Sequence, residues 1–376
     1  MSIVITYLRK GSLLLRNPWF WITIAIIAAG VALTAALDVL YWLAAAFAAA
    51  TLMLLLLFLA AAYAVKPIET PQINHLPQVS KSKHISIIYD CDLTMGRSFR
   101  DVGAGLALLY FLGHPRINPL SVTTTYGNGS VKMTTRTTRR LLNRLGFYEI
   151  DILPGAAGPD TSSQENQAAQ YLKESVAQSP GQIVIVATGS MTNLKHAAAL
   201  DSDFFKKLRG LYLMGGTTEP LVWNGHRLAE RNFSLDPEAA YQAVHADCPV
   251  TIVTGQVGLS AIFRSPQLAA LQALGDPVSK LIAHEIRSWF ALTRLWFQDG
   301  GFGMWDSAAA LALTRPDLFE SERVHITSTL KDLRTGQLYI NPDPNGPVRL
   351  MRRVEDFDKF IMDHFAAWKH LSDTGL

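Results

Sequence analysis

The sequence predicts an α/β fold: an open, mostly parallel β-sheet with helices on both faces, preceded by two transmembrane helices. Two observations support this prediction. Short apolar runs alternate with helical patterns between residues 84 and 255, and strands separated by helices form parallel sheets. A stretch with almost no charge covers residues 19–65, which is long enough to cross a bilayer more than once.

The apolar stretch is divided by Asp38, which is its one charged residue. As a single helix it would be about 70 Å long, more than twice the thickness of a bilayer's hydrocarbon core. We therefore expect a helical hairpin that turns at LDVLYW, residues 37–42. A cleaved signal peptide, with a cleavage site at residues 62–64, is the alternative, but its apolar core would be only about 7–15 residues long.

Basic residues flank the stretch on both sides, and none lies within it. They are Arg9, Lys10 and Arg16 before it, and Lys66, Lys81 and Lys83 after it. By the positive-inside rule, both ends of the hairpin face the cytoplasm. We therefore expect a multi-pass membrane protein whose residues 19–65 contact the lipid bilayer. Residues 1–66 contain the hairpin, residues 67–83 are a Pro-rich linker, and residues 84–376 form a cytoplasmic catalytic domain.

Each element of the large domain follows from its own pattern. HISIIYD (84–90) is a strand, and the small-residue helix after it (102–113) ends at Gly113. A β-rich run (119–128) and an amphipathic helix (134–146) come next. Further strands are expected at 149–155, 181–190, 208–216 and 248–255, with helices at 165–178, 191–201 and 236–246. A helix starting at Trp305, a closing β pair (324–330 and 346–354) and a final amphipathic helix (354–371) complete the domain.

Ligands of such sheets bind beyond the carboxyl ends of the strands. The residues expected there are mostly polar: Asp90, Asp92, Asn128, Thr188, Met214, Gly215 and Thr254. Asp92, Asp101 and Asp306, together with strand-end carbonyls, would suit a hard divalent cation such as calcium, which accepts irregular oxygen cages. Alternatively, Asp101 and Asp306 cap helices.

Composition excludes several classes of protein. A formal net charge of +3 with interspersed signs gives no basic stripe, so no nucleic-acid partner is expected. Cys91 and Cys248 are far apart and have no metal-ligand spacing, which argues against a disulfide scaffold or a zinc site.

Two families share the opening motif. DCDLT (90–94) resembles the haloacid-dehalogenase phosphohydrolases, and IVIVATGS could supply their hydroxyl motif, but their final acidic motif is not found downstream. From about His84 onward, the chain also resembles the inosine–uridine-preferring nucleoside hydrolases in six segments that occur in the same order. These are IIYDCDLT with RDVGAGLALL, SVTTTYGN, VATGSMTNLKHAAAL, LYLMGG, NGHRLAERNFSLDPEAA and MWDSAAALAL.

This second resemblance implies hydrolysis of ribonucleosides to base and ribose, in purine or pyrimidine nucleoside catabolism. It implies a calcium ion held by Asp92, Asp101, the Thr188 carbonyl and Asp306, with Asp92 as the base that activates a calcium-bound water. The substrate-binding residues that it implies are Asn128, Met214, Asn224, Glu230, Asn232, Trp305 and Asp306. Asp236 is expected to cap the helix that follows it, with Pro237 in the first turn. A homo-oligomer is left open.

The chain departs from the family's pattern at two positions. Arg100 stands where the family has the first of two adjacent aspartates, after a lengthened loop. It points to solvent, accepts an anionic substrate group, or marks a membrane-anchored binding protein that has lost catalysis. Trp305 replaces a histidine that donates a proton to the leaving base, and it either stacks on the base or packs in the core. Trp223, Trp296, Phe297 and Phe302 could line a base pocket.

Overall fold

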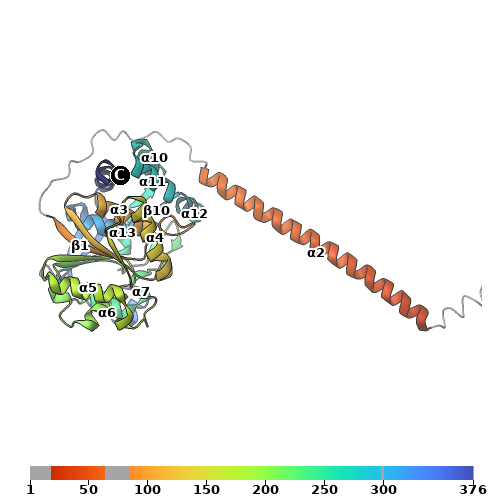
Figure 1. The fold of residues 1–376 in the computed structure, drawn as a ribbon, viewed down its shortest axis with the longest axis horizontal. Helices are drawn as coiled ribbons and strands as arrows, with labels where there is room; N and C mark the ends of the chain where they lie inside the picture. The colour runs from red at the N-terminus through yellow and green to blue at the C-terminus, as the bar shows by residue number, and fades with distance from the viewer. Residues whose placement is uncertain (1–17, 64–83, 298–299, 376) are drawn as a thin grey trace, which may run out of the picture. The chain divides into compact units, whose positions relative to one another are not determined.

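The computed structural model describes residues 18–63, 84–297 and 300–375 (Figure 1). By its internal contacts the chain divides into two units, residues 1–64 and 65–376, and each is considered by itself. The predicted linker, residues 67–83, lies outside the described residues.

The N-terminal unit contains one uninterrupted helix, α2 (Pro18–Tyr63), so the prediction of a two-helix hairpin is wrong in this structure. The expected turn LDVLYW contains neither glycine nor proline. Asp38 alone costs a helix well under about 1 kcal/mol, and alanine and leucine on both sides favour the helix. Among the described residues one segment, Val39–Leu56, is long and apolar enough to cross a membrane, and a shorter apolar segment covers Trp21–Val31.

The second unit is built on a nine-stranded sheet in the order β12-β11-β13-β8-β5-β4-β1-β2-β3. The seven strands from β13 to β3 run parallel, while β11 is antiparallel to both of its neighbours. The strands are β1 (Ile85–Cys91), β2 (Ile117–Thr124), β3 (Asp151–Pro154), β4 (Ile183–Ala187), β5 (Gly210–Met214), β8 (Val250–Val253), β11 (Phe319–Ile326), β12 (Ile340–Pro342) and β13 (Val348–Val354). The predicted open, mostly parallel sheet and its closing β pair are confirmed.

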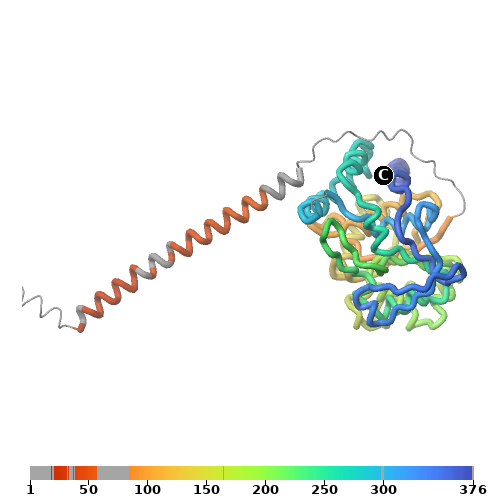
Figure 2. Tube along the Cα trace, turned by 180° about the vertical axis from the view of Figure 1, so that it is seen from behind, coloured from red at the N-terminus to blue at the C-terminus, as the bar shows by residue number. Residues whose placement is uncertain are grey.

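Helices cover both faces of the sheet, as the alternating pattern predicts (Figures 1 and 2). Side chains of β1 alternate between two apolar cores: Ile87 and Tyr89 enter one, and Ile88 enters the other. The first core packs against α3 (Gly103–Gly113), α4 (Val131–Arg144), α9 (Gly255–Ser260), α10 (Ser265–Leu274), α11 (Pro277–Glu285), α12 (Arg287–Phe297), α13 (Trp305–Ala312) and α15 (Phe357–Gly375). The second packs against α5 (Gln167–Gln178), α6 (Thr192–Leu200), α7 (Asn232–Leu235), α8 (Pro237–Val244) and α14 (Leu330–Leu333).

Two short antiparallel pairs lie outside the main sheet. They are β9 (Ile262–Arg264) with β10 (Gly301–Gly303), and β6 (Val222–Trp223) with β7 (His226–Arg227). The 3₁₀ turns are η1 (Ser163–Glu165), η2 (Phe205–Lys207) and η3 (Pro316–Leu318). The second pair and α12 lie beyond the carboxyl ends of the parallel strands, where their side chains help to enclose a cavity.

Candidate active site

A cavity of about 370 Å³ opens beyond the carboxyl ends of the parallel strands. Its lining comes from the loops after β1, β2, β4, β5 and β8, from the β6–β7 hairpin, and from α12 and α13. The lining residues are Asp101, Gly103, Asn128, Thr188, Met214, Leu221, Trp223, Leu228, Ala229, Glu230, Arg231, Asn232, Gly255, Trp289, Thr293, Trp296, Phe297, Phe302, Trp305 and Asp306.

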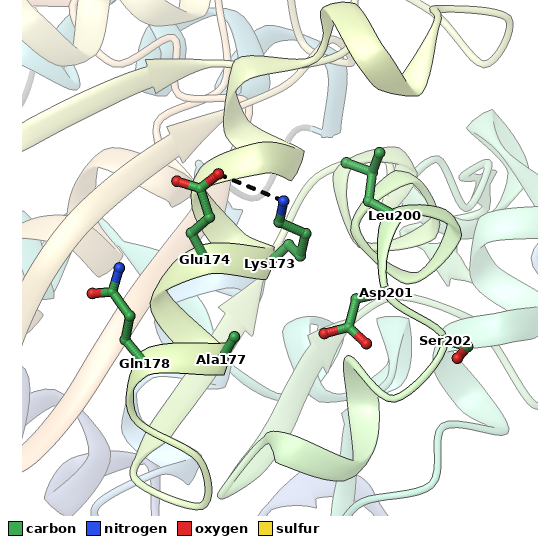
Figure 3. A pocket seen from close by; sticks show the side chains of 7 residues that line it. All are labelled: Lys173, Glu174, Ala177, Gln178, Leu200, Asp201 and Ser202. Atoms are coloured by element: carbon green, nitrogen blue, oxygen red, sulfur yellow. Dashed lines mark ion pairs between the residues drawn. The ribbon is translucent and has the colours of Figure 1, made fainter.

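A second hollow lies between α5 and the end of α6 (Figure 3). Its charged residues already pair with neighbours: Lys173 with Glu174 at 3.5 Å, and Asp201 with Lys207 at 2.5 Å. The hollow is open to solvent on a helical surface, away from the strand ends. The cavity at the strand ends is therefore the candidate active site.

Asp92 follows the end of β1 and is buried, with 1% of its surface exposed. It is not one of the lining residues, but it contacts Asn128, which is. Its carboxylate accepts two hydrogen bonds from Asn128, one from the backbone amide at 2.6 Å and one from the side-chain amide at 3.1 Å. Burial raises the pKa of Asp92 to about 7, against the lowering effect of these bonds, and repulsion from Asp101 adds to the rise. A carboxyl group with a pKa near neutrality is suited to exchange protons with substrate or water.

Asp101 and Asp306 meet at Gly103, although they lie far apart in sequence. An ideal Cβ on Gly103 would be 3.1 Å from Asp101 Oδ1 and 3.0 Å from Asp306 Oδ2, so these two oxygens are at most about 6 Å apart. Asp101 also accepts a hydrogen bond from the Gly103 amide at 2.9 Å. Burial raises the pKa of Asp306 well above its usual range, and the charges of Asp101 and Asp92 raise it further.

These three carboxylates are the right donors for a hard cation, but they do not form a closed cage. Among the described residues, no group of three Asp, Glu, His or Cys side chains lies close enough to hold one ion. Both oxygens of Asp92 accept hydrogen bonds from Asn128. Within the described residues, the side chain of buried Asp306 makes no hydrogen bond, so its oxygens are available to a ligand. The donor chemistry fits calcium.

The strand-end residues Thr188 and Met214 are joined by Asn232. Its side-chain amide donates to the Met214 carbonyl at 3.0 Å and to the Thr188 carbonyl at 3.3 Å. All three residues line the cavity, as the sequence predicts. The Thr188 carbonyl, expected to contact a cation, accepts from an amide in this arrangement.

Glu230 lines the cavity but uses its carboxylate to brace the backbone. It accepts from the amides of Gly216 at 3.1 Å, Phe233 at 3.0 Å and Ser234 at 3.0 Å. Burial raises the pKa of Glu230, and these amides oppose the rise. Glu230 therefore fixes the segment that carries Asn232.

Asn224 and Arg100 lie outside the cavity lining. Asn224 sits in the exposed β6–β7 turn with a φ of 48°, and its side chain donates to the Phe297 carbonyl at 2.7 Å. Arg100 is exposed and donates to the Asn128 carbonyl at 3.0 Å. Of the three alternatives for Arg100, this placement agrees with the one in which the guanidinium turns away from the carboxylates.

Aromatic side chains form a large part of the cavity lining, which we call the aromatic wall. Trp223 stacks on Phe297 with ring centroids 4.2 Å apart, and Trp305 donates its indole N–H to the Gly255 carbonyl at 3.0 Å. Sequence reasoning missed Trp289, Thr293 and Arg231 in this lining. Trp289, Thr293 and Trp296 lie four and three residues apart, so they share one face of α12, and this spacing could have revealed them.

Comparison with known proteins agrees with this geometry. Residues 87–361 match the sequence profile described as inosine-uridine preferring nucleoside hydrolase. Uridine nucleosidase 1 of Arabidopsis thaliana is 28% identical over 267 residues, which are 63% of this chain and 76% of that protein. The pyrimidine-specific ribonucleoside hydrolase RihA of Shewanella sp. (strain MR-7) is 27% identical over 263 residues, which are 63% of this chain and 80% of that protein.

Solved structures share the fold at lower identity. A plant nucleoside hydrolase superposes with a TM-score of 0.65 at 20% identity, covering 76% of this chain and 98% of its own. A purine-preferring ribonucleoside hydrolase from Gardnerella vaginalis gives a TM-score of 0.66 at 20% identity, covering 76% and 99%. At 20% identity, these structural similarities show that the chain shares the fold of these proteins.

Proposed function

The chain belongs to the inosine-uridine preferring nucleoside hydrolase family, and we propose that this nucleoside N-ribohydrolase uses Asp92 as the general base that splits the N-glycosidic bond. The observation that carries the proposal is the buried Asp92 carboxylate, which Asn128 holds at the strand end with a pKa of about 7. Around neutral pH a large share of such groups is ionised and able to accept a proton from attacking water.

The carboxylates around the ribose favour the transition state by their charge. Departure of the base leaves positive charge on C1′ and the ring oxygen, as in other glycoside cleavages. Asp101 and Asp306 are held in place by the fold before substrate arrives, so they stabilise this charge without reorganising. Asn232 would hold a sugar hydroxyl from the other side, since its side chain is fixed to two strand-end carbonyls.

We further propose that Asp92, Asp101, Asp306 and the Thr188 carbonyl hold a calcium ion. When bound, the ion would grip the ribose 2′ and 3′ hydroxyls and lower the pKa of a water molecule. Support comes from the repulsion between carboxylates: Asp101 and Asp306 meet at Gly103, and the charges of Asp101 and Asp92 add to the raised pKa of buried Asp306. A nearby cation would relieve this repulsion.

The leaving base would lie against the aromatic wall. Trp305 cannot protonate it, because indole has no acidic proton near neutral pH and its N–H already donates to Gly255. Trp223 and Phe297, which stack on each other, would instead flank the flat ring. Uridine is the first substrate to test, because relatives of 27–28% identity carry pyrimidine activities in their names.

We also propose that the apolar segment Val39–Leu56 anchors a cytoplasmic enzyme to a membrane. Its composition and the exposure of its side chains support this. Alkaline carbonate extraction of membranes from cells that express the full chain tests it. Release of the protein into the soluble fraction would contradict the anchor, and digestion of the large domain by protease added outside intact cells would contradict the cytoplasmic placement.

The catalytic proposal is tested with purified full-length protein, uridine, inosine and adenosine, with calcium or with excess chelator. Free base should form in calcium and fall at least tenfold after chelation. Base release at the same rate in chelator would refute the calcium site. Calcium and nucleoside binding without release of any base would identify a binding protein that has lost catalysis.

A further inference from the structure

Arg231 is the one lysine or arginine in the cavity lining of the described residues. It lies between Glu230 and Asn232, and both neighbours are fixed by hydrogen bonds to the strand-end loops. The carbonyl of Arg231 accepts bonds from Leu235 at 3.1 Å and from Ser234 at 3.3 Å. The backbone that carries this guanidinium is thus held on both sides, so its position at the cavity is set by the fold.

The guanidinium of Arg231 forms no ion pair or side-chain hydrogen bond with the described part of the chain, and the residue is exposed. Exposed Arg136, Arg139 and Arg227 likewise have no side-chain partner among the described residues, but they lie outside the cavity lining, whereas Arg231 belongs to it. Arg231 and Asp101 line the same cavity, and their opposite charges attract each other. A cation with five donors therefore belongs to the cavity lining, and the described residues leave those donors unused.

The two other sides of the cavity already suit two parts of a ribonucleoside. The aromatic wall suits the base, and the carboxylate end suits the 2′,3′-diol. The third substituent of the ribose is the 5′ carbon, and Arg231 is the one cationic side chain that the described cavity lining offers to a group at this position. A neutral 5′-hydroxyl needs only one donor or acceptor, whereas a planar guanidinium matches two oxygens of a phosphate at once.

We propose that the preferred substrate is a ribonucleoside 5′-monophosphate, with its phosphate bound by the guanidinium of Arg231. This rests on the proposed hydrolase function and specifies its substrate class. Water adds to C1′, the bond from C1′ to the base nitrogen breaks with its electron pair passing to the base, and the base takes up a proton. The products are free base and ribose 5-phosphate. A calcium ion at the carboxylates would repel Arg231 from Asp101 and leave it to the phosphate.

The test compares uridine with uridine 5′-monophosphate, and inosine with inosine 5′-monophosphate, in calcium buffer. The variants are Arg231→Ala, Arg231→Lys and, as a matched control, Arg227→Ala, which removes an exposed arginine of β7 outside the cavity lining. The readout is the ratio of kcat/KM for nucleotide over nucleoside. Wild type should favour the nucleotide, and Arg231→Ala should lower the ratio roughly tenfold to a hundredfold, mainly through KM. Arg231→Lys should restore part of it, and Arg227→Ala should keep it.

The outcomes separate this inference from the hydrolase proposal. Turnover of nucleosides with a ratio that Arg231→Ala leaves unchanged overturns the inference and keeps the hydrolase. If Arg231→Ala lowers the turnover of nucleotide and nucleoside by the same factor, the inference is also overturned. Arg231 would then act on the catalytic carboxylates and not on a phosphate. If wild type turns over neither compound, calorimetry decides: nucleotide binding that Arg231→Ala weakens supports the inference, and no nucleotide binding overturns it.

Discussion

Replacing Asp92 by asparagine should remove catalysis and, without calcium at alkaline pH, stabilise the fold. The substitution keeps the size of the side chain and removes its charge and its basicity. Loss of a general base costs roughly 10²–10⁴-fold in rate, so kcat should fall at least a hundredfold. Activity and stability should change in opposite directions because the ionised carboxylate is needed for catalysis but its burial lowers the free energy of unfolding.

The gain in stability follows from the pKa of Asp92. Burial raises it from 3.8 to about 7, and at about 1.36 kcal/mol per pKa unit this corresponds to roughly 4 kcal/mol. Asparagine would still accept from the Asn128 amide, but its own NH₂ would face the Asn128 side chain, which costs about 1–2 kcal/mol. The net gain in free energy of unfolding should be about 2 kcal/mol above pH 7.

The free energy of unfolding of the wild-type protein should depend on pH through Asp92. Between about pH 4 and pH 7, folded wild-type protein binds more protons at Asp92 than the unfolded chain does. The stability of wild type therefore falls as pH rises through this window, and the advantage of Asp92→Asn should grow across it. Below pH 4 both forms are neutral at this position, and the variant should be no more stable than wild type.

The assay is urea denaturation in excess chelator at pH 5, 6, 7 and 8.5, with base release from uridine measured in calcium. Asp90→Asn is the matched control. Asp90 is also buried, its pKa is raised to about 6, and its carboxylate accepts from Thr123 and Asn193 outside the cavity lining. The control should keep turnover within about tenfold of wild type. Undiminished base release by Asp92→Asn, or a variant less stable than wild type at pH 8.5, would refute the reasoning.

Three further predictions concern the same cavity. Calcium binding by the metal-free protein should weaken below pH 7, because the proton that Asp92 takes up there competes with the ion; equal calcium affinity from pH 5 to 8, measured by calorimetry, would contradict this. Asp306→Asn should weaken calcium affinity at least tenfold by calorimetry, since the site loses one of three carboxylates, and equal affinity would exclude Asp306 as a ligand. Arg100→Ala should lower kcat/KM for uridine only a fewfold, because its bond to the Asn128 carbonyl is exposed; loss of all calcium binding would show that Arg100 shapes the site directly.

The sequence was sufficient to predict the role of a residue when that role depends only on the helix or strand in which the residue lies. Asp236 was expected to cap the helix that follows it, and its carboxylate accepts from the Ala239 amide at 3.0 Å. The strand-end aspartates were found in the same way, because an apolar run that stops at a carboxylate marks the end of a buried strand. The parallel sheet followed from the alternation of such runs with helices.

The sequence was less informative wherever the outcome depends on distant partners. The length of the apolar stretch exceeds one span and predicts a hairpin, yet no residue near Asp38 breaks the helix. Asn224 was expected at the substrate, but the Asn-Gly pair that it forms with Gly225 makes a tight β6–β7 turn and leaves its side chain bonded to Phe297. Arg231 was missed because nothing in its local sequence shows that the fold brings it into the same cavity lining as Asp101.

Gly103 shows how closely the fold brings negative charge together at this site. With any larger residue there, the new Cβ would approach carboxylate oxygens of Asp101 and Asp306 at about 3 Å, so these carboxylates would have to shift by a few tenths of an ångström. The fold therefore brings together like charges whose pKa values it must raise, a cost that apolar residues would avoid. Stability lost at a site in this way is commonly recovered as function. Here a bound cation and the positive charge of a ribosyl transition state are the two partners that would relieve the repulsion.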